Sequence, residues 1–243
     1  MLVLAWDTAT PVLELALVRF GPNGQMEVLG HYLGDGQASH GSVLAPQVQA
    51  LLRAVGVTPG EVALLAVGLG PGSFTGLRVG LALAKGLSLA TGRPSVGISS
   101  LELLAAQAPQ GARLVAPLID ARHREIFWAL YQAGPRGLTP LTGILAQGPD
   151  KLLKTLAELK SSGEPVTLIG PGQSLLPEKP DWARLGSAQG PSALVLAQMA
   201  WALRERGQLA SHPLIPLYGR SPEIFQAWRP PQRLAESQDA SRT

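Results

Sequence analysis

The chain has 243 residues, of which 46% are apolar and 15% are charged, and its formal net charge is +3. This length and composition suit a folded protein with a sizeable core, in one large or two medium domains, and exclude a disordered chain. The absence of cysteine excludes disulfides, a thiolate nucleophile and cysteine-ligated metals. No apolar run approaches the roughly 20 residues that cross a bilayer, and no basic stretch precedes the apolar N-terminus. We therefore expect a cytoplasmic protein.

The first hundred residues predict strands alternating with helices. Residues 2–6 form a continuous apolar run typical of a buried strand, and a second strand alternates at period two. Asp7, Thr8 and Thr10 lie in the turn between them, and Pro46 fits a helix only in its first turn. The predicted strands span 2–6, 13–17, 23–34, 62–70 and 94–100, and the predicted helices span 42–57, 73–90 and 100–108.

The same pattern then restarts. Residues 112–132 predict a strand, a turn that contains Asp120, and another strand, followed by a loose stretch rich in glycine and proline. Helices are predicted over 149–159 and 191–206, and a strand over 165–170 ends in the turn Gly170-Pro171-Gly172. Two halves with a similar opening predict a duplicated α/β fold.

The most distinctive stretch is GPGSFTGLRVGLALAKG, residues 70–86. A phosphate-binding P-loop needs a second glycine five residues after the first, but Gly70 is followed there by Thr75 and Gly72 by Leu77. The dinucleotide fingerprint and the serine elbow of hydrolases need spacings that this stretch lacks. The amides after Gly72 could still hold an anion at a helix N-terminus.

Within this stretch, Gly76, Gly80 and Ala84 recur every four residues and line one side of the predicted helix. A glycine inside a helix costs about 1 kcal/mol relative to alanine, so two on one side need a reason. Two interpretations stay open from the residues alone. The small side chains could allow close packing on the chain's own sheet, or close approach by a helix of another chain.

Other polar residues give weaker indications. Asp7 and Asp120, each in a turn between strands, could hold a Mg²⁺-nucleotide or could simply bond their own turns. The arginines are scattered and lack the dense basic stripe of a dedicated nucleic-acid binder. The four histidines have no mutual metal-ligand spacing: His31, His40, His123 and His212.

Several blocks together resemble the TsaB (YeaZ) family. They occur in the family's order between residues 2 and 220, so the resemblance covers nearly the whole chain, and the GPGSFTGLR block is highly specific. The blocks are LAWDTAT, GPGSFTGLRVGLALAKGL, ISSLELLA, IDARHREIFWALY and PLYGR.

The resemblance implies an α/β fold of two ribonuclease-H-like subdomains of the actin/Hsp70 (ASKHA) type, with mixed sheets flanked by helices. We expect an N-terminal actin-like subdomain over 1–108, which carries the dimerisation helices, and a C-terminal one over 109–229. Helix 191–206 could pack back on the first subdomain. Residues 230–243 are expected to be a disordered tail.

The resemblance also implies a role in making threonylcarbamoyladenosine beside the anticodon of tRNAs that read codons beginning with A. In that pathway a TsaB-like subunit binds the catalytic paralogue TsaD, and the ATPase TsaE joins the two. The TsaB-like subunit meets tRNA only through this complex. The catalytic paralogue carries an H-x-x-x-H metal pair, whereas here Leu44 stands four residues after His40. The resemblance therefore implies a scaffold subunit with no catalytic residue, metal or cofactor of its own.

In the family, the helices that match 42–55 and 73–90 pack against the partner, which favours the interface interpretation of the small-residue side. Alone, the chain is expected to form a homodimer through the same surface. The expected interface residues are Leu44, Val48, Leu51, Ser73, Phe74, Gly76, Leu77, Gly80 and Ala84.

Two other functions stay open. The chain could be an actin/Hsp70-type protein that binds or hydrolyses ATP, and Mg-ATP or ADP could bind at the complex interface. Alternatively, the basic residues Arg220, Arg229 and Arg233 could contact tRNA directly. The residues expected to bind nucleotide are Asp7, Thr8, Asp120, Gly170 and Gly172.

Overall fold

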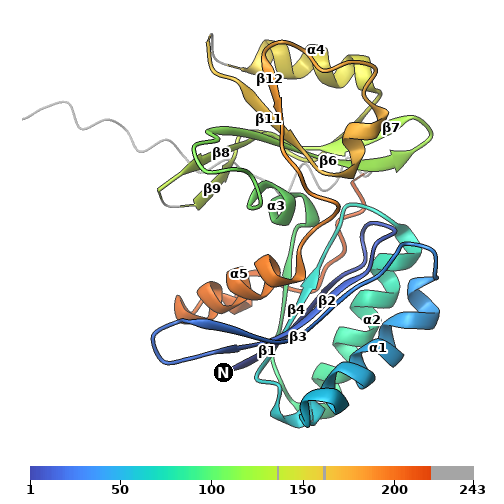
Figure 1. Ribbon diagram of the computed structural model, residues 1–243, viewed down its shortest axis with the longest axis vertical. Coiled ribbons are helices and arrows are strands. Elements are labelled where there is room, and N and C mark those ends of the chain that lie inside the picture. Colours follow the sequence, from blue (N-terminus) through green and yellow to red (C-terminus); the bar gives the residue numbers. More distant parts are fainter. Residues whose placement is uncertain (136, 161–162, 220–243) are drawn as a thin grey trace, which may run out of the picture.

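The computed structural model describes residues 1–135, 137–160 and 163–219, which form two sheets with helices around each (Figure 1). The first half of the chain contributes a five-stranded sheet and the second half a seven-stranded sheet. Helix α3 (Ser100–Ala105) lies between them. The other elements of the first half are β1 (Leu2–Asp7), β2 (Glu14–Phe20), β3 (Met26–Leu33), α1 (His40–Val55), η1 (Pro59–Glu61), β4 (Leu64–Gly68), α2 (Phe74–Thr91) and β5 (Ser95–Ile98).

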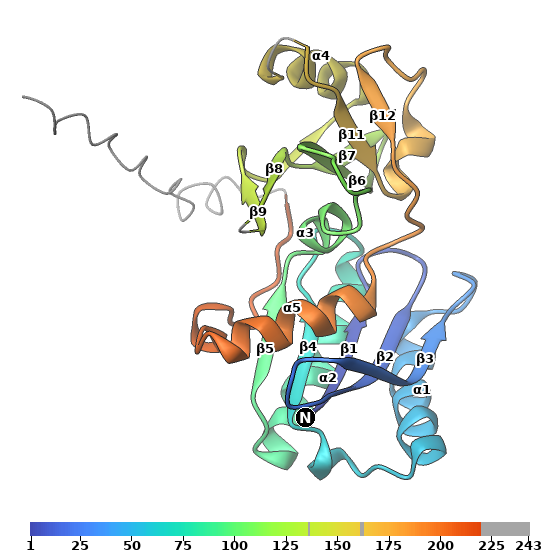
Figure 2. The same ribbon diagram turned by 60° about the vertical axis from the view of Figure 1, so that its left-hand side comes forward.

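The first sheet has the order β3-β2-β1-β4-β5, with β1 antiparallel to β2 and parallel to β4. The side chains of β1 alternate between two cores. Leu4 and Trp6 pack with residues of α1 and α2, whereas Val3 and Ala5 pack with residues of α5 (Ala193–Glu205) on the other face (Figure 2). Because both faces are covered, the apolar run of β1 is continuous.

The second sheet repeats this plan. Its main path is β10-β7-β6-β11-β12, in which β7 is antiparallel to β6 and β10, and β11 is parallel to β6 and β12. The predicted α/β class, with two mixed sheets flanked by helices, is confirmed. The remaining elements are β6 (Leu114–Arg122), β7 (Glu125–Trp128), β8 (Tyr131–Gly134), β9 (Gly137–Pro140), β10 (Leu145–Gln147), α4 (Pro149–Leu159), β11 (Val166–Ile169), η2 (Pro171–Leu175), β12 (Ala183–Leu185) and η3 (Leu209–Ser211).

The two halves exchange helices. Helix α3 follows the last strand of the first sheet, yet its Leu101 and Leu104 pack with β6 and β11 of the second. Helix α5 follows the last strand of the second sheet, yet its Leu196 and Ala197 pack on the first. Leu103 of α3 also belongs to the first core, so this short helix joins both cores.

Two local predictions are wrong. Pro46 lies in the second turn of α1, because the helix begins at His40. Proline has no amide hydrogen, so the Ser42 carbonyl lacks its helical hydrogen bond. Both residues are exposed. The stretch predicted to be loose contains the β8–β9 hairpin, in which Tyr131 pairs with Pro140. Gly137 has a φ of 104°, a left-handed value that glycine adopts without strain.

The tail predicted for residues 230–243 lies outside the described residues, as do the arginines at 220, 229 and 233. No helix in the described part of the chain has the length and hydropathy of a segment that crosses a bilayer.

Candidate functional site

Asp7, at the carboxyl end of β1, is sealed inside the protein. It is 1% exposed, and both of its carboxylate oxygens are occupied. The amide of Ala9 donates to Oδ1 (2.8 Å) and the hydroxyl of Ser100, the first residue of α3, donates to Oδ2 (2.5 Å). Burial raises the pKa of Asp7 to about 6, although the bonds from Ser100 and Ala9 oppose the shift. A carboxylate held in this way has no free face for a cation.

Glycines pack tightly around this end of β1. A Cβ at Gly68 would overlap the Asp7 carboxylate, and a Cβ at Gly72 would overlap the backbone of Ala9. The amide of Ser73 donates to the Ala9 carbonyl (2.7 Å), which ties the start of α2 to the turn after β1. The loop before α2, whose amides could have held an anion, therefore packs against the chain's own backbone.

The small-residue side of α2 faces this same strand. A Cβ at Gly76 would overlap the Thr8 carbonyl, and one at Gly80 would lie 2.5 Å from Thr8 Oγ1 and 3.3 Å from the Trp6 indole nitrogen. That indole nitrogen donates to the Gly80 carbonyl (3.2 Å). The residues therefore allow α2 to pack closely on the chain's own sheet, the first of the two interpretations above.

In the single chain, most of the residues predicted to face a partner lie in its own core. Leu51 is half-buried over Gly30, and Ser73 is half-buried as the N-cap of α2, where its hydroxyl accepts from the Gly76 amide (3.1 Å). Phe74 is exposed (51%). The remaining six are buried in the core of the single chain: Leu44, Val48, Gly76, Leu77, Gly80 and Ala84.

The opposite sides of α1 and α2 form a surface that we call the outer face. Small residues occupy its middle, exposed apolar side chains and cations surround them, and Leu89 is 87% exposed. Residues seven positions apart on a helix return to nearly the same side, which places these side chains together. The outer face consists of Pro46, Ala50, Arg53, Phe74, Arg78, Ala82, Lys85, Gly86 and Leu89.

Phe74 is fixed at one end of the outer face. The Arg78 guanidinium lies 3.7 Å from the centre of the Phe74 ring, and the Tyr218 ring lies 5.1 Å from it. Tyr218 belongs to the last described segment, which is tied to the first sheet because the Leu217 amide donates to the Leu69 carbonyl (2.8 Å). The end of the described chain therefore supports the start of α2.

Groups of the protein itself contact the predicted nucleotide residues of the second half. The Arg122 amide donates to Asp120 Oδ1 (2.7 Å), which is the bond to its own turn considered above. A Cβ at Gly170 would lie 2.6 Å from the Leu118 carbonyl oxygen, and one at Gly172 would lie 2.8 Å from the Leu118 carbonyl carbon. The absence of a side chain at both glycines therefore lets strand β6 pack closely against them.

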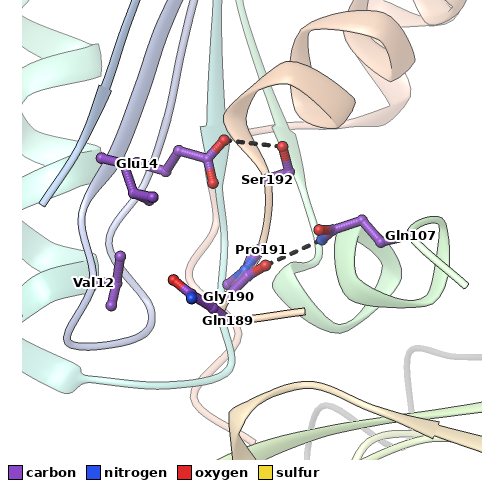
Figure 3. Close-up of a pocket in the computed structure, with 8 residues that line it drawn as sticks. Val12, Glu14, Gln107, Gln189, Gly190, Pro191 and Ser192 are labelled. Atoms are coloured by element: carbon purple, nitrogen blue, oxygen red, sulfur yellow. Dashed lines mark hydrogen bonds between the residues drawn. The ribbon is translucent and has the colours of Figure 1, made fainter. Parts of the chain in front are cut away.

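A cavity of about 200 Å³ lies near the turn after β1 and is shown in Figure 3. Glu14 stands at its wall, where its Oε1 accepts from the Ser192 hydroxyl (2.9 Å) and lies 3.0 Å from His31 Nε2. Gln107 donates across the cavity to the Gly190 carbonyl (3.1 Å). None of the described residues that line it is lysine or arginine. A carboxylate in the wall, with no lysine or arginine beside it, repels the phosphates of a nucleotide.

The position that matches the histidine pair of the catalytic paralogue has only one histidine in this chain. His40 Nε2 lies 3.1 Å from the Pro11 carbonyl, and burial lowers the pKa of this histidine. Leu44, where the second histidine would stand, is buried in the core. Within residues 1–135, 137–160 and 163–219, no three His, Asp or Glu side chains are grouped so that they could hold a metal ion.

The comparisons with known proteins agree with the resemblance seen in the sequence. A family model described as TsaD, tRNA N6-adenosine threonylcarbamoyltransferase, matches residues 35–185, more than half of the chain. The tRNA threonylcarbamoyladenosine biosynthesis protein TsaB of Bacillus subtilis is 30% identical over 94% of this chain and 98% of its own length. The chain belongs to the TsaB (YeaZ) family.

Two further TsaB (YeaZ) proteins show how far the similarity extends. TsaB of Escherichia coli is 38% identical over 57% of this chain and 58% of its own length. The structure of YeaZ from Pseudomonas aeruginosa matches with a TM-score of 0.71 at 29% identity, covering 89% of this chain and 99% of that one. The fold of a TsaB (YeaZ) protein therefore extends through nearly all of this chain.

The packing of α2 on β1 predicts that Gly80→Val destabilises the single chain by about 1–3 kcal/mol, the usual range for overpacking a core. Urea unfolding measures the change. The matched control is Gly86→Ala on the same helix, where a Cβ meets nothing within 4 Å. That control is expected to be neutral or to gain up to about 1 kcal/mol. Unchanged stability of Gly80→Val would contradict the observed packing.

The sealed position of Asp7 predicts a particular pH dependence. The pKa is 3.8 for an unperturbed aspartate and about 6 here, so between these pH values the folded chain keeps a proton that the unfolded chain releases. The contribution of Asp7 to the free energy of unfolding is therefore greatest below about pH 4 and falls as pH rises through about 6. At 1.36 kcal/mol for each pH unit, the loss is about 3 kcal/mol.

Asp7→Asn removes this titration, because an amide does not ionise in this range. The free energy of unfolding of wild type minus that of the variant, measured in urea from about pH 4 to about pH 7, should fall by about 2.4 kcal/mol, since the rest of the change lies below pH 4. A constant difference across the range would mean that Asp7 titrates alike in both states.

Proposed function

We propose that this chain is a non-catalytic scaffold subunit in tRNA threonylcarbamoyladenosine biosynthesis and that its outer face docks a TsaD-like catalytic paralogue. The observation that carries the proposal is the exposure of Phe74 (51%) and Leu89 (87%) around small residues on two well-packed helices. Fully burying a side chain of this kind contributes about 1.5–3 kcal/mol. Membership of the TsaB (YeaZ) family, and the match to a TsaD family model, support the same assignment.

The small residues in the middle of the outer face suit a helical partner. Ala50, Ala82 and Gly86 leave room for another helix to approach closely, and α1 and α2 already lie side by side. The neighbouring elements hold these helices firmly, because their inner sides are buried in the core. A surface that is fixed before binding loses little conformational freedom when a partner docks.

The non-catalytic part of the proposal rests on the positions that chemistry would use. His40 is half-buried and has Leu44 where a second metal-binding histidine would stand, and Asp7 is bonded on both oxygens. We accordingly assign the reaction to the paralogue, with this chain stabilising it.

The finer parts of the assignment follow from the family resemblance. We propose that a TsaE-like ATPase joins the complex, that tRNAs reading codons beginning with A are modified in the cytoplasm, and that tRNA is met only through the complex. In the absence of the paralogue, a second copy of the chain would cover the outer face as a homodimer.

The docking proposal predicts that Ala82→Trp weakens binding to a purified TsaD-like paralogue at least about tenfold, because a bulky side chain at the centre of a close-packed interface prevents contact. Calorimetric titration measures the affinity, and recovery of tRNA modification in cells that lack the native subunit measures function. The matched control is Ala157→Trp, at an exposed position of α4. Neither substitution changes the charge of the chain.

The control should bind as wild type does. If Ala82→Trp also binds and restores modification like wild type, the outer face is not the docking surface.

The competing ATPase function gives a separate prediction. Because Asp7 is sealed and the nearby cavity presents Glu14 to any phosphate, titration of the isolated chain with Mg·ATP should give no binding heat and no hydrolysis. Saturable binding that Asp7→Asn abolishes would instead support the nucleotide function.

A further inference from the structure

The two helices of the outer face carry cations and no carboxylate. Helices α1 and α2 contain no aspartate or glutamate, and their basic side chains Arg53, Arg78 and Lys85 are all exposed. The acidic residues that flank α1 along the chain are Asp35 and Glu61, outside both helices. Their carboxylates accept bonds from the Gln37 amide and from the Thr58 amide and hydroxyl, respectively.

The three cations stand where a partner would meet them. Arg78 and Lys85 are seven residues apart, which places them on one side of α2 about 10 Å from each other. Arg78 is held over the Phe74 ring, inside the apolar part of the face. Among the described residues, the ion pairs do not include Arg53, Arg78 or Lys85. Each therefore brings an uncompensated charge to any interface formed there.

A second copy of the chain would bring the same apolar and small residues to this face, but also the same charge. In a two-fold dimer each copy presents the same patch, so the cations of one copy approach the cations of the other. Like charges brought together at an interface weaken binding, and in this case no carboxylate on either helix offsets them. Only the apolar contacts favour such a dimer.

We infer that the outer face selects a protein partner whose facing helices carry carboxylates, and that pairing with a second copy is the weaker alternative. The inference rests on the proposed function, because it states which chemistry the docked paralogue presents. An acidic helical surface buries the exposed apolar side chains and also pairs its carboxylates with the cations. A nucleic acid would satisfy the cations only, and would leave Leu89 and the small residues without contact.

Charge reversal on one copy of the full chain tests the charge selection without the paralogue. The double substitution Arg78→Glu and Lys85→Glu changes two exposed side chains and should leave the fold intact, which circular dichroism checks. Sedimentation equilibrium then compares wild type, the variant and their equimolar mixture. The mixture should associate at least about tenfold more tightly than wild type alone, because opposite charges replace like ones across the interface.

Salt gives a second readout. Between about 50 mM and about 500 mM NaCl, screening should strengthen wild-type self-association and weaken association in the mixture. The matched control reverses Lys151 and Lys154 on α4 (Lys151→Glu, Lys154→Glu), with the same change of net charge on the other subdomain. A mixture of the control with wild type should associate no more tightly than wild type alone.

Failure of the inference and failure of the proposed function are distinguishable. If the paralogue loses affinity for Ala82→Trp but binds the charge-reversed chain as tightly as wild type, the docking surface stands and the charge selection is overturned. If the reversed chain loses RNA affinity and keeps paralogue affinity, the cations serve a nucleic acid and the inference is again overturned. If neither substitution affects the paralogue, the outer face itself is not the interface.

Discussion

The close contact between α2 and the end of β1 determines which side of α2 faces outward. Gly76 and Gly80 leave no side chain where Thr8 and Trp6 lie, and the Trp6 indole is bonded to the Gly80 carbonyl. That contact fixes which side of α2 points inward. The opposite side, with Ala82 and Leu89, must then point outward, so a requirement of the core creates the outer face.

The same packing encloses residues that the sequence suggested for nucleotide binding. Asp7 is enclosed by Gly68 and Ser100, and η2 brings Gly172 against β6. The exchange of α3 and α5 between the two sheets ties the halves together on both sides. The fold thus keeps the duplicated plan while its interior is used for packing, which suits a subunit that acts through its surface.

Local patterns were sufficient to predict the duplicated α/β plan, and they placed α4 at 149–159, as observed. The spacing of Gly76, Gly80 and Ala84 correctly indicated one close-packed side of a helix. It could not indicate which neighbour approaches, because a strand of the same chain and a helix of another chain make the same demand for small residues. The bond from Ser100 to Asp7 joins residues 93 positions apart, and no local pattern predicts it.

In the proposed complex, the outer side of α2, not its glycine side, meets the paralogue. The chain has no cysteine, so Ala82→Cys and the control Ala157→Cys each provide one thiol whose labelling rate can be followed. Adding a saturating TsaD-like paralogue should slow labelling at position 82 at least about tenfold and leave position 157 unchanged. Equal labelling rates at position 82 with and without bound paralogue would show that the paralogue does not cover the outer side of α2.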